Sequence, residues 1–190
     1  MDFELTETAK EVRESARAFA ARLKPLAAAW DEDEAIPPEF LREAGRLGFF
    51  GLMVAQEYGG MGLDALSYVV AMEELARANA SYQGCLSVHN SLVCAALSRF
   101  GTPEQKSRYL PKLAAGEWIG AYSLSEPGSG SDAGSIATVA KPEGDGFLIN
   151  GAKCWVTNGG IADLFVVFVS TSPASASRGI SFFIVEKGTS

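Results

Sequence analysis

The chain of 190 residues carries 16 Lys or Arg against 23 Asp or Glu, a formal net charge of -7 that argues against a binder of nucleic acid or of an acidic membrane. Apolar residues make up 47% of the chain and charged residues 21%, which is enough for a packed core and excludes a disordered protein. Because the longest apolar run, residues 164–169, is far shorter than the roughly 20 residues that span a bilayer, we expect a soluble protein without a membrane segment.

The first 118 residues are predicted to form a helical bundle. In residues 5–30, apolar side chains recur at alternating steps of four and three, the period of one helix face, and Pro25 is expected to kink or divide this helix. Pro37-Pro38 favours the start of another helix, since proline fits the first helical turn. Residues 57–62 are rich in glycine and predict a loop.

Further helices are expected before residue 118. The helical period returns in residues 66–77 and 86–100, and the second of these is expected to end at Gly101. Thr102-Pro103-Glu104-Gln105 has the pattern of a capping box with proline at the first helical position, which predicts a helix to about Ala115.

Residues 119–190 predict a β domain, because charged residues become rarer there and glycine more frequent. Tight hairpin turns are expected at Gly144-Asp145-Gly146 and Asn150-Gly151, since such turns need residues that tolerate positive φ. The strands are predicted from short β-branched and aromatic runs at residues 147–149, 154–156, 164–170 and 180–185.

The expected fold is therefore an α+β multidomain arrangement. An all-α helical bundle over residues 1–118 precedes an antiparallel β-barrel-like domain over residues 119–190. The second domain is expected to be incomplete, because the chain stops just after a strand and leaves that strand's edge unprotected. We therefore interpret the chain as truncated or as one that needs a partner.

The potential metal and disulfide ligands are sparse. Cys85, Cys94 and Cys154 are an odd number at spacings that fit neither a disulfide framework nor a zinc site, so reduced thiols are expected. His89 lies in an apolar helical pattern and is expected to be a packing residue rather than a ligand, since metal sites need several convergent donors. No metal is predicted.

The first residues, Met1-Asp2-Phe3-Glu4, lack the basic start of a secretory signal, and acids are interspersed through the first helix. A cytoplasmic location is expected, unless a presequence has already been removed.

A dense polar stretch at residues 121–134 is the first candidate site. Gly128 and Gly130 could turn backbone N–H groups toward a ligand, and the hydroxyls of Ser125, Ser129 and Ser131 could serve a carbonyl, a phosphate or a heteroaromatic edge. A surface turn rich in turn-forming residues is the alternative. The glycine spacing fits neither the dinucleotide fingerprint nor a P-loop, so a nucleotide fold of those types is not expected.

The stretch Lys153-Cys-Trp-Val-Thr-Asn-Gly-Gly160 is the second candidate. If it is a strand, Trp155 and Thr157 share one face, and an indole beside a hydroxyl suits a planar heteroaromatic ligand. The alternative is that Trp155 fills the core of the sheet.

Together these stretches resemble the paired flavin-site motifs of the acyl-CoA dehydrogenase family. The resemblance rests on Tyr122-Ser-Leu-Ser-Glu-Pro-Gly-Ser-Gly-Ser-Asp132 followed by Trp155-Val-Thr-Asn-Gly159, and it extends to residues 56–62 and 110–117. It is collinear over essentially the whole chain. It implies a helical N-terminal domain, a middle β domain and a C-terminal helical domain, of which the last is absent here.

The resemblance implies FAD as the cofactor and an acyl-CoA as the substrate. The region of Leu124 and Ser125 would lie at the pyrimidine side of the flavin, Thr157 would place its hydroxyl near N5, and Ser131 would contact the pantetheine. The implied cofactor-binding residues are Tyr122, Leu124, Ser125, Trp155, Val156 and Thr157, and the implied substrate-binding residue is Ser131.

The implied reaction is α,β-dehydrogenation, in which a carboxylate removes the α-proton and the β-hydride passes to the flavin. That base belongs to the family's C-terminal domain, so no catalytic residue is assigned here, and Glu126 and Asp132 are interpreted as loop braces. A chain of these residues alone is expected to be inactive. An electron-transfer flavoprotein is the implied partner, and a homotetramer the implied assembly.

Two other functions remain open. An acyl-CoA oxidase or another superfamily member would share the flavin motifs, and a flavin-free subunit or scaffold would keep the fold without the chemistry. The length and branching of the acyl group are not readable from the sequence.

Overall fold

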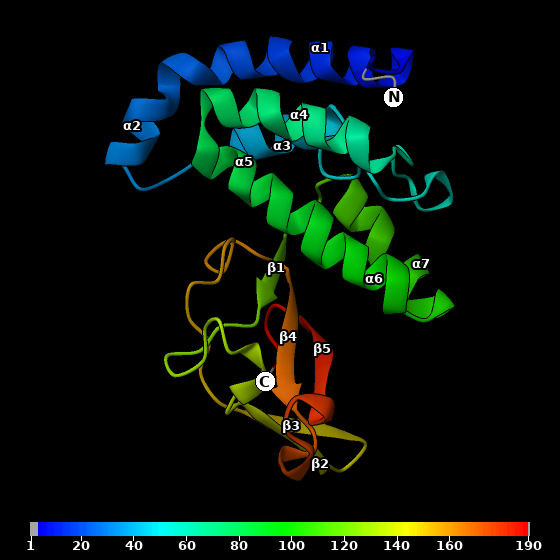
Figure 1. Ribbon diagram of the computed structural model, residues 1–190, viewed down its shortest axis with the longest axis vertical. Helices are drawn as coiled ribbons and strands as arrows, with labels where there is room; N and C mark the ends of the chain where they lie inside the picture. Colours follow the sequence, from blue (N-terminus) through cyan, green and yellow to red (C-terminus); the bar gives the residue numbers. More distant parts are fainter. Residues whose placement is uncertain (1–3, 190) are drawn as a thin grey trace. The chain divides into compact units, whose positions relative to one another are not determined.

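The structure is a computed structural model that describes residues 4–189, and these form two compact units that divide between Trp118 and Ile119 (Figure 1). Residues 1–3, on which the expected lack of a leader rests, and residue 190 lie outside this range. A helical domain followed by a β domain is confirmed. Within the described part of the chain, no helix is both long and apolar enough to cross a membrane.

The first unit is helical, and each helix contributes at least one buried side chain to its core. Its helices are α1 (Glu7–Leu23), α2 (Ala27–Glu32), α3 (Pro38–Arg46), α4 (Ala65–Ala78), α5 (Ala80–Ser87), α6 (Ala95–Phe100) and α7 (Pro103–Ala114). A short 3-10 turn, Lys24–Leu26, separates α1 from α2 and confirms that Pro25 divides the first predicted helix. The capping box at the start of α7 is also confirmed, with Thr102 and Gln105 each accepting a hydrogen bond from the other's backbone N–H.

Helices α1 and α4 pack against each other and are tied by a largely buried carboxylate. Glu74 is 6% exposed, and Arg17 donates to both of its oxygens at 3.1 and 2.7 Å. The hydrogen bond from Arg17 lowers the pKa of Glu74 below its ordinary value. The pair therefore fixes the mutual position of the two helices.

A single continuous helix was predicted over residues 86–100, and the structure instead shows a π-helical stretch, Val88–Cys94, between α5 and α6. Asn90 lies in this stretch and is buried. Its amide donates to the carbonyls of Phe49 at 2.8 Å and Leu86 at 3.0 Å, and its oxygen accepts from the backbone N–H of Leu52 at 3.1 Å. One side chain thus satisfies backbone groups that the loop after α3 leaves without helical partners.

The second unit is built on a five-stranded mixed sheet whose central strand is β4. The strands are β1 (Gly120–Ser123), β2 (Val139–Glu143), β3 (Gly146–Asn150), β4 (Leu164–Ser170) and β5 (Ile180–Glu186). β4 pairs with β5 along its whole length in an antiparallel register, whereas its pairings with β1 and β2 are parallel. The antiparallel expectation therefore holds for β2–β3 and β4–β5 and is wrong for the other two pairings.

The hairpin between β2 and β3 turns at Gly144 and Asp145, as predicted, and Gly144 has a φ of +56°. Two strands were not predicted. β1 is only four residues long, and β2 contains Lys141 and Pro142, a composition that lowers strand propensity.

Two predictions about residues 150–156 were wrong. Asn150 ends β3 and no hairpin follows, because the chain continues past Gly151 without pairing back onto β3. The run 154–156 is a loop rather than a strand, and Trp155 has a φ of +56°, which is unfavourable for an aromatic L-residue. Composition favoured a strand there, but tertiary hydrogen bonds impose the loop.

We expect Asn90→Ala to lower the free energy of unfolding by about 2–4 kcal/mol, since it leaves buried backbone groups of two loop residues without partners. Urea unfolding followed by circular dichroism at 222 nm would measure this. The exposed neighbour Ser98→Ala is the matched control and should change stability by less than about 0.5 kcal/mol. Equal effects of the two substitutions would contradict this role for Asn90.

Candidate functional site

The two motifs singled out in the sequence lie side by side in the β unit. The backbone N–H of Cys154 donates to the carbonyl of Ser125 at 2.9 Å, and the Lys153 ammonium donates to the carbonyl of Leu124 at 3.0 Å. These contacts join segments 29 residues apart. The candidate site is therefore one surface made by the loop after β1 and the loop after β3.

Tyr122 lies in β1, an edge strand of the sheet that pairs in parallel with the central strand β4. Its half-buried ring packs 4.8 Å from the ring of Phe168, and burial raises the pKa of its hydroxyl. Leu124 and Ser125 follow directly and are also half-buried. These three residues lead from the sheet into the candidate site.

The loop after Ser125 is closed by a short backbone bridge. Glu126 and Ser129 exchange backbone hydrogen bonds at 2.9 and 3.1 Å, and the Ser129 hydroxyl donates to the carbonyl of Asp132 at 2.7 Å. Ser129 is 3% exposed, so the expectation that its hydroxyl serves a ligand is wrong, because that hydroxyl braces the loop. Ser131 is exposed, and the space where Cβ atoms would stand on Gly128 and Gly130 is open.

Trp155 is presented to solvent in an unusual way. Its side chain is 93% exposed, the most exposed large apolar group among the described residues, and its backbone is held in the left-handed region. The alternative that it fills the sheet core is therefore wrong. Val156 is half-buried and Thr157 exposed, and they enter a turn fixed by the Asn158 amide, which donates to the Gly120 carbonyl at 3.1 Å.

A buried ion pair stands behind this surface. Lys153 and Glu126 have side chains 11% and 6% exposed, with the ammonium 2.7 Å from the carboxylate. Glu126 also accepts from the backbone N–H groups of Ala137 at 2.6 Å and Thr138 at 3.0 Å. The interpretation of Glu126 as a loop brace fits these contacts, while the role of Lys153 was missed because no local pattern marks a lysine that will be buried.

The electrostatics of Glu126 follow from these partners. Burial by itself raises the pKa of the carboxyl group, but the hydrogen bonds from Lys153 and from two backbone N–H groups outweigh it and lower the pKa from 4.5 to about 2. A shift of this size corresponds to about 3 kcal/mol of stability. The carboxylate is thus ionised and saturated with donors at neutral pH.

The surface fits one side of a planar heteroaromatic ligand such as the predicted flavin. An exposed indole held by a strained backbone supplies a flat apolar face, and Ser125 and Thr157 supply hydroxyl groups beside it. Packing within the chain does not require glycine at residues 128 and 130, where a larger side chain has room. A close approach of a ligand to this backbone would require it.

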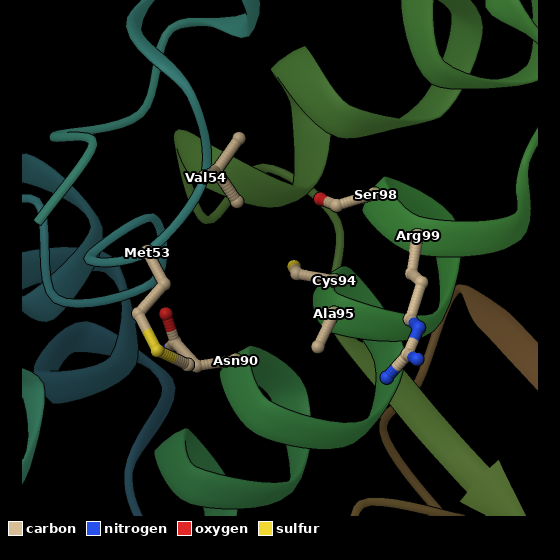
Figure 2. A pocket seen from close by; sticks show the side chains of 7 residues that line it. All are labelled: Met53, Val54, Asn90, Cys94, Ala95, Ser98 and Arg99. Atoms are coloured by element: carbon tan, nitrogen blue, oxygen red, sulfur yellow. The ribbon is translucent and has the colours of Figure 1, made fainter. Parts of the chain in front are cut away.

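The helical unit contains a separate pocket of about 290 Å³ between the loop after α3 and the π-helical stretch with α6 (Figure 2). Its walls are mainly apolar, with a guanidinium at one side. Figure 2 shows the side chains that line it, which are Met53, Val54, Asn90, Cys94, Ala95, Ser98 and Arg99. Burial raises the pKa of the Cys94 thiol, and the Asn90 amide is engaged with backbone groups, so these side chains offer no activated nucleophile.

His89 lies in the core of the helical unit. Its ring packs edge-on against Phe50 with ring centres 4.7 Å apart, and Nε2 is 3.1 Å from the carbonyl oxygen of Leu113. Burial lowers the pKa of this imidazole to about 4. Within the described part of the chain, no group of three or more His, Cys, Asp and Glu could hold a metal ion, and the cysteines are free thiols.

Comparison with known families assigns both units. Residues 6–117 match the acyl-CoA dehydrogenase N-terminal domain, and residues 121–190 match the acyl-CoA dehydrogenase middle domain. A curated relative, "Acyl-CoA dehydrogenase, short-chain specific" of Clostridium acetobutylicum, is 47% identical over 189 residues, which cover 99% of this chain and 50% of the relative. The chain thus spans about half the length of the curated relatives it matches.

Solved structures give the same assignment. A chain in a structure named "Electron transferring flavoprotein of Acidaminococcus fermentans: Towards a mechanism of flavin-based electron bifurcation" matches with a TM-score of 0.95 and 40% identity over 99% of this chain and 50% of that one. A glutaryl-CoA dehydrogenase from Mycobacterium smegmatis in complex with FADH2 matches with a TM-score of 0.90 and 35% identity, covering 97% of this chain and 47% of that one.

The lowered pKa of Glu126 should make the stability of the chain depend on pH. Because the pKa is lowered on folding from 4.5 to about 2, its contribution to stability is present above pH 4.5 and is lost as the pH falls toward 2. Urea midpoints measured between pH 7 and pH 2 should therefore fall less steeply for Glu126→Gln than for the unaltered chain. The exposed Glu143→Gln is the control, and an unchanged pH profile in Glu126→Gln would contradict the lowered pKa.

Proposed function

This chain belongs to the acyl-CoA dehydrogenase family, and we propose that it supplies the flavin-facing surface of an FAD-dependent enzyme that dehydrogenates acyl-CoA thioesters between the α and β carbons. The name of the Clostridium relative, which specifies short chains, supports a short acyl group. Two further features belong to the same proposal, that residues 1–118 and 119–190 are separate domains and that the whole protein is a cytoplasmic homotetramer.

One observation carries the proposal. The hydrogen bond from Cys154 to Ser125 brings a 93% exposed indole next to a loop with hydroxyl groups and open glycine positions. A single exposed apolar residue is ordinary by itself, but this indole lies beside hydroxyl groups and open glycine positions, and the combination favours a binding role. The strained φ of +56° at Trp155 costs about 1–2 kcal/mol, and such strain is found mainly at functional sites.

Each predicted residue then has a role in holding the ligand. Trp155 and Val156 would flank the ring system, and the Thr157 hydroxyl would orient its reactive edge. On the other loop, Tyr122, Leu124 and Ser125 would line the flavin, and Ser131 would contact the pantetheine part of the CoA thioester. Bound FAD would supply the acceptor for the β-hydride of the substrate, that is, for one proton together with two electrons.

The described carboxylates of this site do not supply the base. Glu126 is held at a pKa of about 2 by Lys153 and by backbone donors, so it is a very weak proton acceptor at neutral pH. The Asp132 carboxylate accepts from the Ser135 hydroxyl within its own loop. We therefore propose that a group from another segment removes the α-proton and that this chain orients the cofactor and substrate.

The structure named for an electron transferring flavoprotein supports a protein of that class as the electron acceptor. This acceptor distinguishes a dehydrogenase from an oxidase, which would pass the electrons to oxygen. Anaerobic reduction by an acyl-CoA followed by exposure to either acceptor would separate the two functions.

A chimera tests the function directly. This chain would replace the matching half of the Clostridium acetobutylicum relative, and butyryl-CoA-dependent reduction of ferrocenium would be measured. We expect the chimera to turn over substrate, and this chain alone to show less than about 1% of that rate. A folded but colourless chimera would contradict the proposal and favour a flavin-free scaffold.

We expect Trp155→Ala to weaken FAD binding by about tenfold or more, since loss of aromatic stacking removes about 1–2 kcal/mol. The quenching of flavin fluorescence during titration of the chimera measures this. Leu148→Ala, a 51% exposed residue of the same unit, is the matched control and should leave the affinity unchanged. Equal affinities for both variants would mean that Trp155 does not contact the flavin.

A further inference from the structure

We infer that Glu126 and Lys153 are positioning residues, whose buried ion pair acts as a clasp that sets the distance and orientation between Trp155 and the Leu124–Ser125 segment. This inference rests on the proposed function, because its consequence is the placement of the flavin.

The contacts of the pair support the clasp. Lys153 donates to Glu126 at 2.7 Å and to the Leu124 carbonyl at 3.0 Å, so one ammonium holds the first loop at two points. The carboxylate in turn accepts from the backbone of Ala137 and Thr138, just before β2. Three stretches of backbone distant in sequence therefore meet at one pair of charges.

The position of the pair in the sequence gives it leverage on the site. Glu126 directly follows Ser125, and Lys153 lies two residues before Trp155. The hydrogen bond from Cys154 to Ser125 runs between the same two segments. We therefore expect a shift of the ion pair to move the indole relative to the loop that faces it.

Burial distinguishes this pair from surface ion pairs of the same chain. The Lys10 and Glu7 side chains are 39% and 84% exposed, so water competes for them and their geometry is loose. Lys153 and Glu126 are 11% and 6% exposed, and removal of one partner would leave the other charge buried and uncompensated. Neutralising both charges with side chains of similar volume avoids that penalty.

Comparison of the single and double variants separates an effect on the position of Trp155 from an effect on the stability of the β unit. Glu126→Gln and Lys153→Met should each destabilise the β unit, whereas the double variant should recover much of the thermal stability. The double variant still lacks the ammonium that holds the Leu124 carbonyl. We therefore expect it to be stable and yet to present Trp155 in the wrong place.

The test compares four forms of the chimera with the Clostridium acetobutylicum relative, which are the unaltered chimera, both single variants and the double variant. Lys141→Met and Glu143→Gln, which remove exposed charges from β2, are the matched controls. Three quantities are measured for each: the melting temperature, the hydrogen-exchange rate of the Cys154 amide without flavin, and the FAD affinity with the shape of the visible flavin spectrum.

We expect the double variant to exchange the Cys154 amide at least tenfold faster and to bind FAD at least tenfold more weakly than the controls, at a melting temperature near theirs. The inference would be overturned if the double variant matched the controls in amide exchange and FAD affinity as well as in melting temperature, since the pair would then serve stability only. If the unaltered chimera and the controls bind no FAD, the proposed function loses its support, while the exchange rate of the Cys154 amide still shows whether the ion pair holds the two loops together.

Discussion

The arrangement of the loops in the β unit depends on one buried carboxylate, Glu126, which needs several hydrogen-bond donors. Glu126 meets this need with an ammonium and two backbone N–H groups, which come from the residues just before β2 and from the loop after β3. The helical unit meets similar needs with Arg17 on Glu74 and with the buried amide of Asn90. Arg17 and Glu74 join two regular helices, whereas Asn90 and Glu126 hold irregular segments in place with buried polar side chains.

Much of the fold could be predicted because the signals are local. The capping box of Thr102 and Gln105, the division at Pro25 and the hairpin at Gly144 each depend on residues a few positions apart. The π-helical stretch could not be predicted in this way. It is coupled to the contacts of Asn90 with Phe49, a residue 41 positions away.

The residues of the candidate site were predicted from the sequence, but their arrangement in space was not. Trp155 and Thr157 were expected to share the face of a strand, since their neighbours are β-branched or aromatic. The observed loop depends on Ser125 and Leu124, which lie about 29 residues earlier and accept hydrogen bonds from Cys154 and Lys153. Long-range hydrogen bonds therefore overrode local propensity, and Ser129 turned inward for the same kind of reason.

The same contacts that make Glu126 a good brace make it unsuitable as a base. A proton acceptor needs a pKa near the working pH and an oxygen free to meet the substrate, whereas Glu126 has a pKa of about 2 and two oxygens engaged by Lys153 and by backbone donors. Freeing it would remove the clasp and disorganise the surface that it supports. Orientation and proton removal therefore place opposite demands on one carboxylate, which is a physical reason to expect the base on a different segment from the loops that we propose face the flavin.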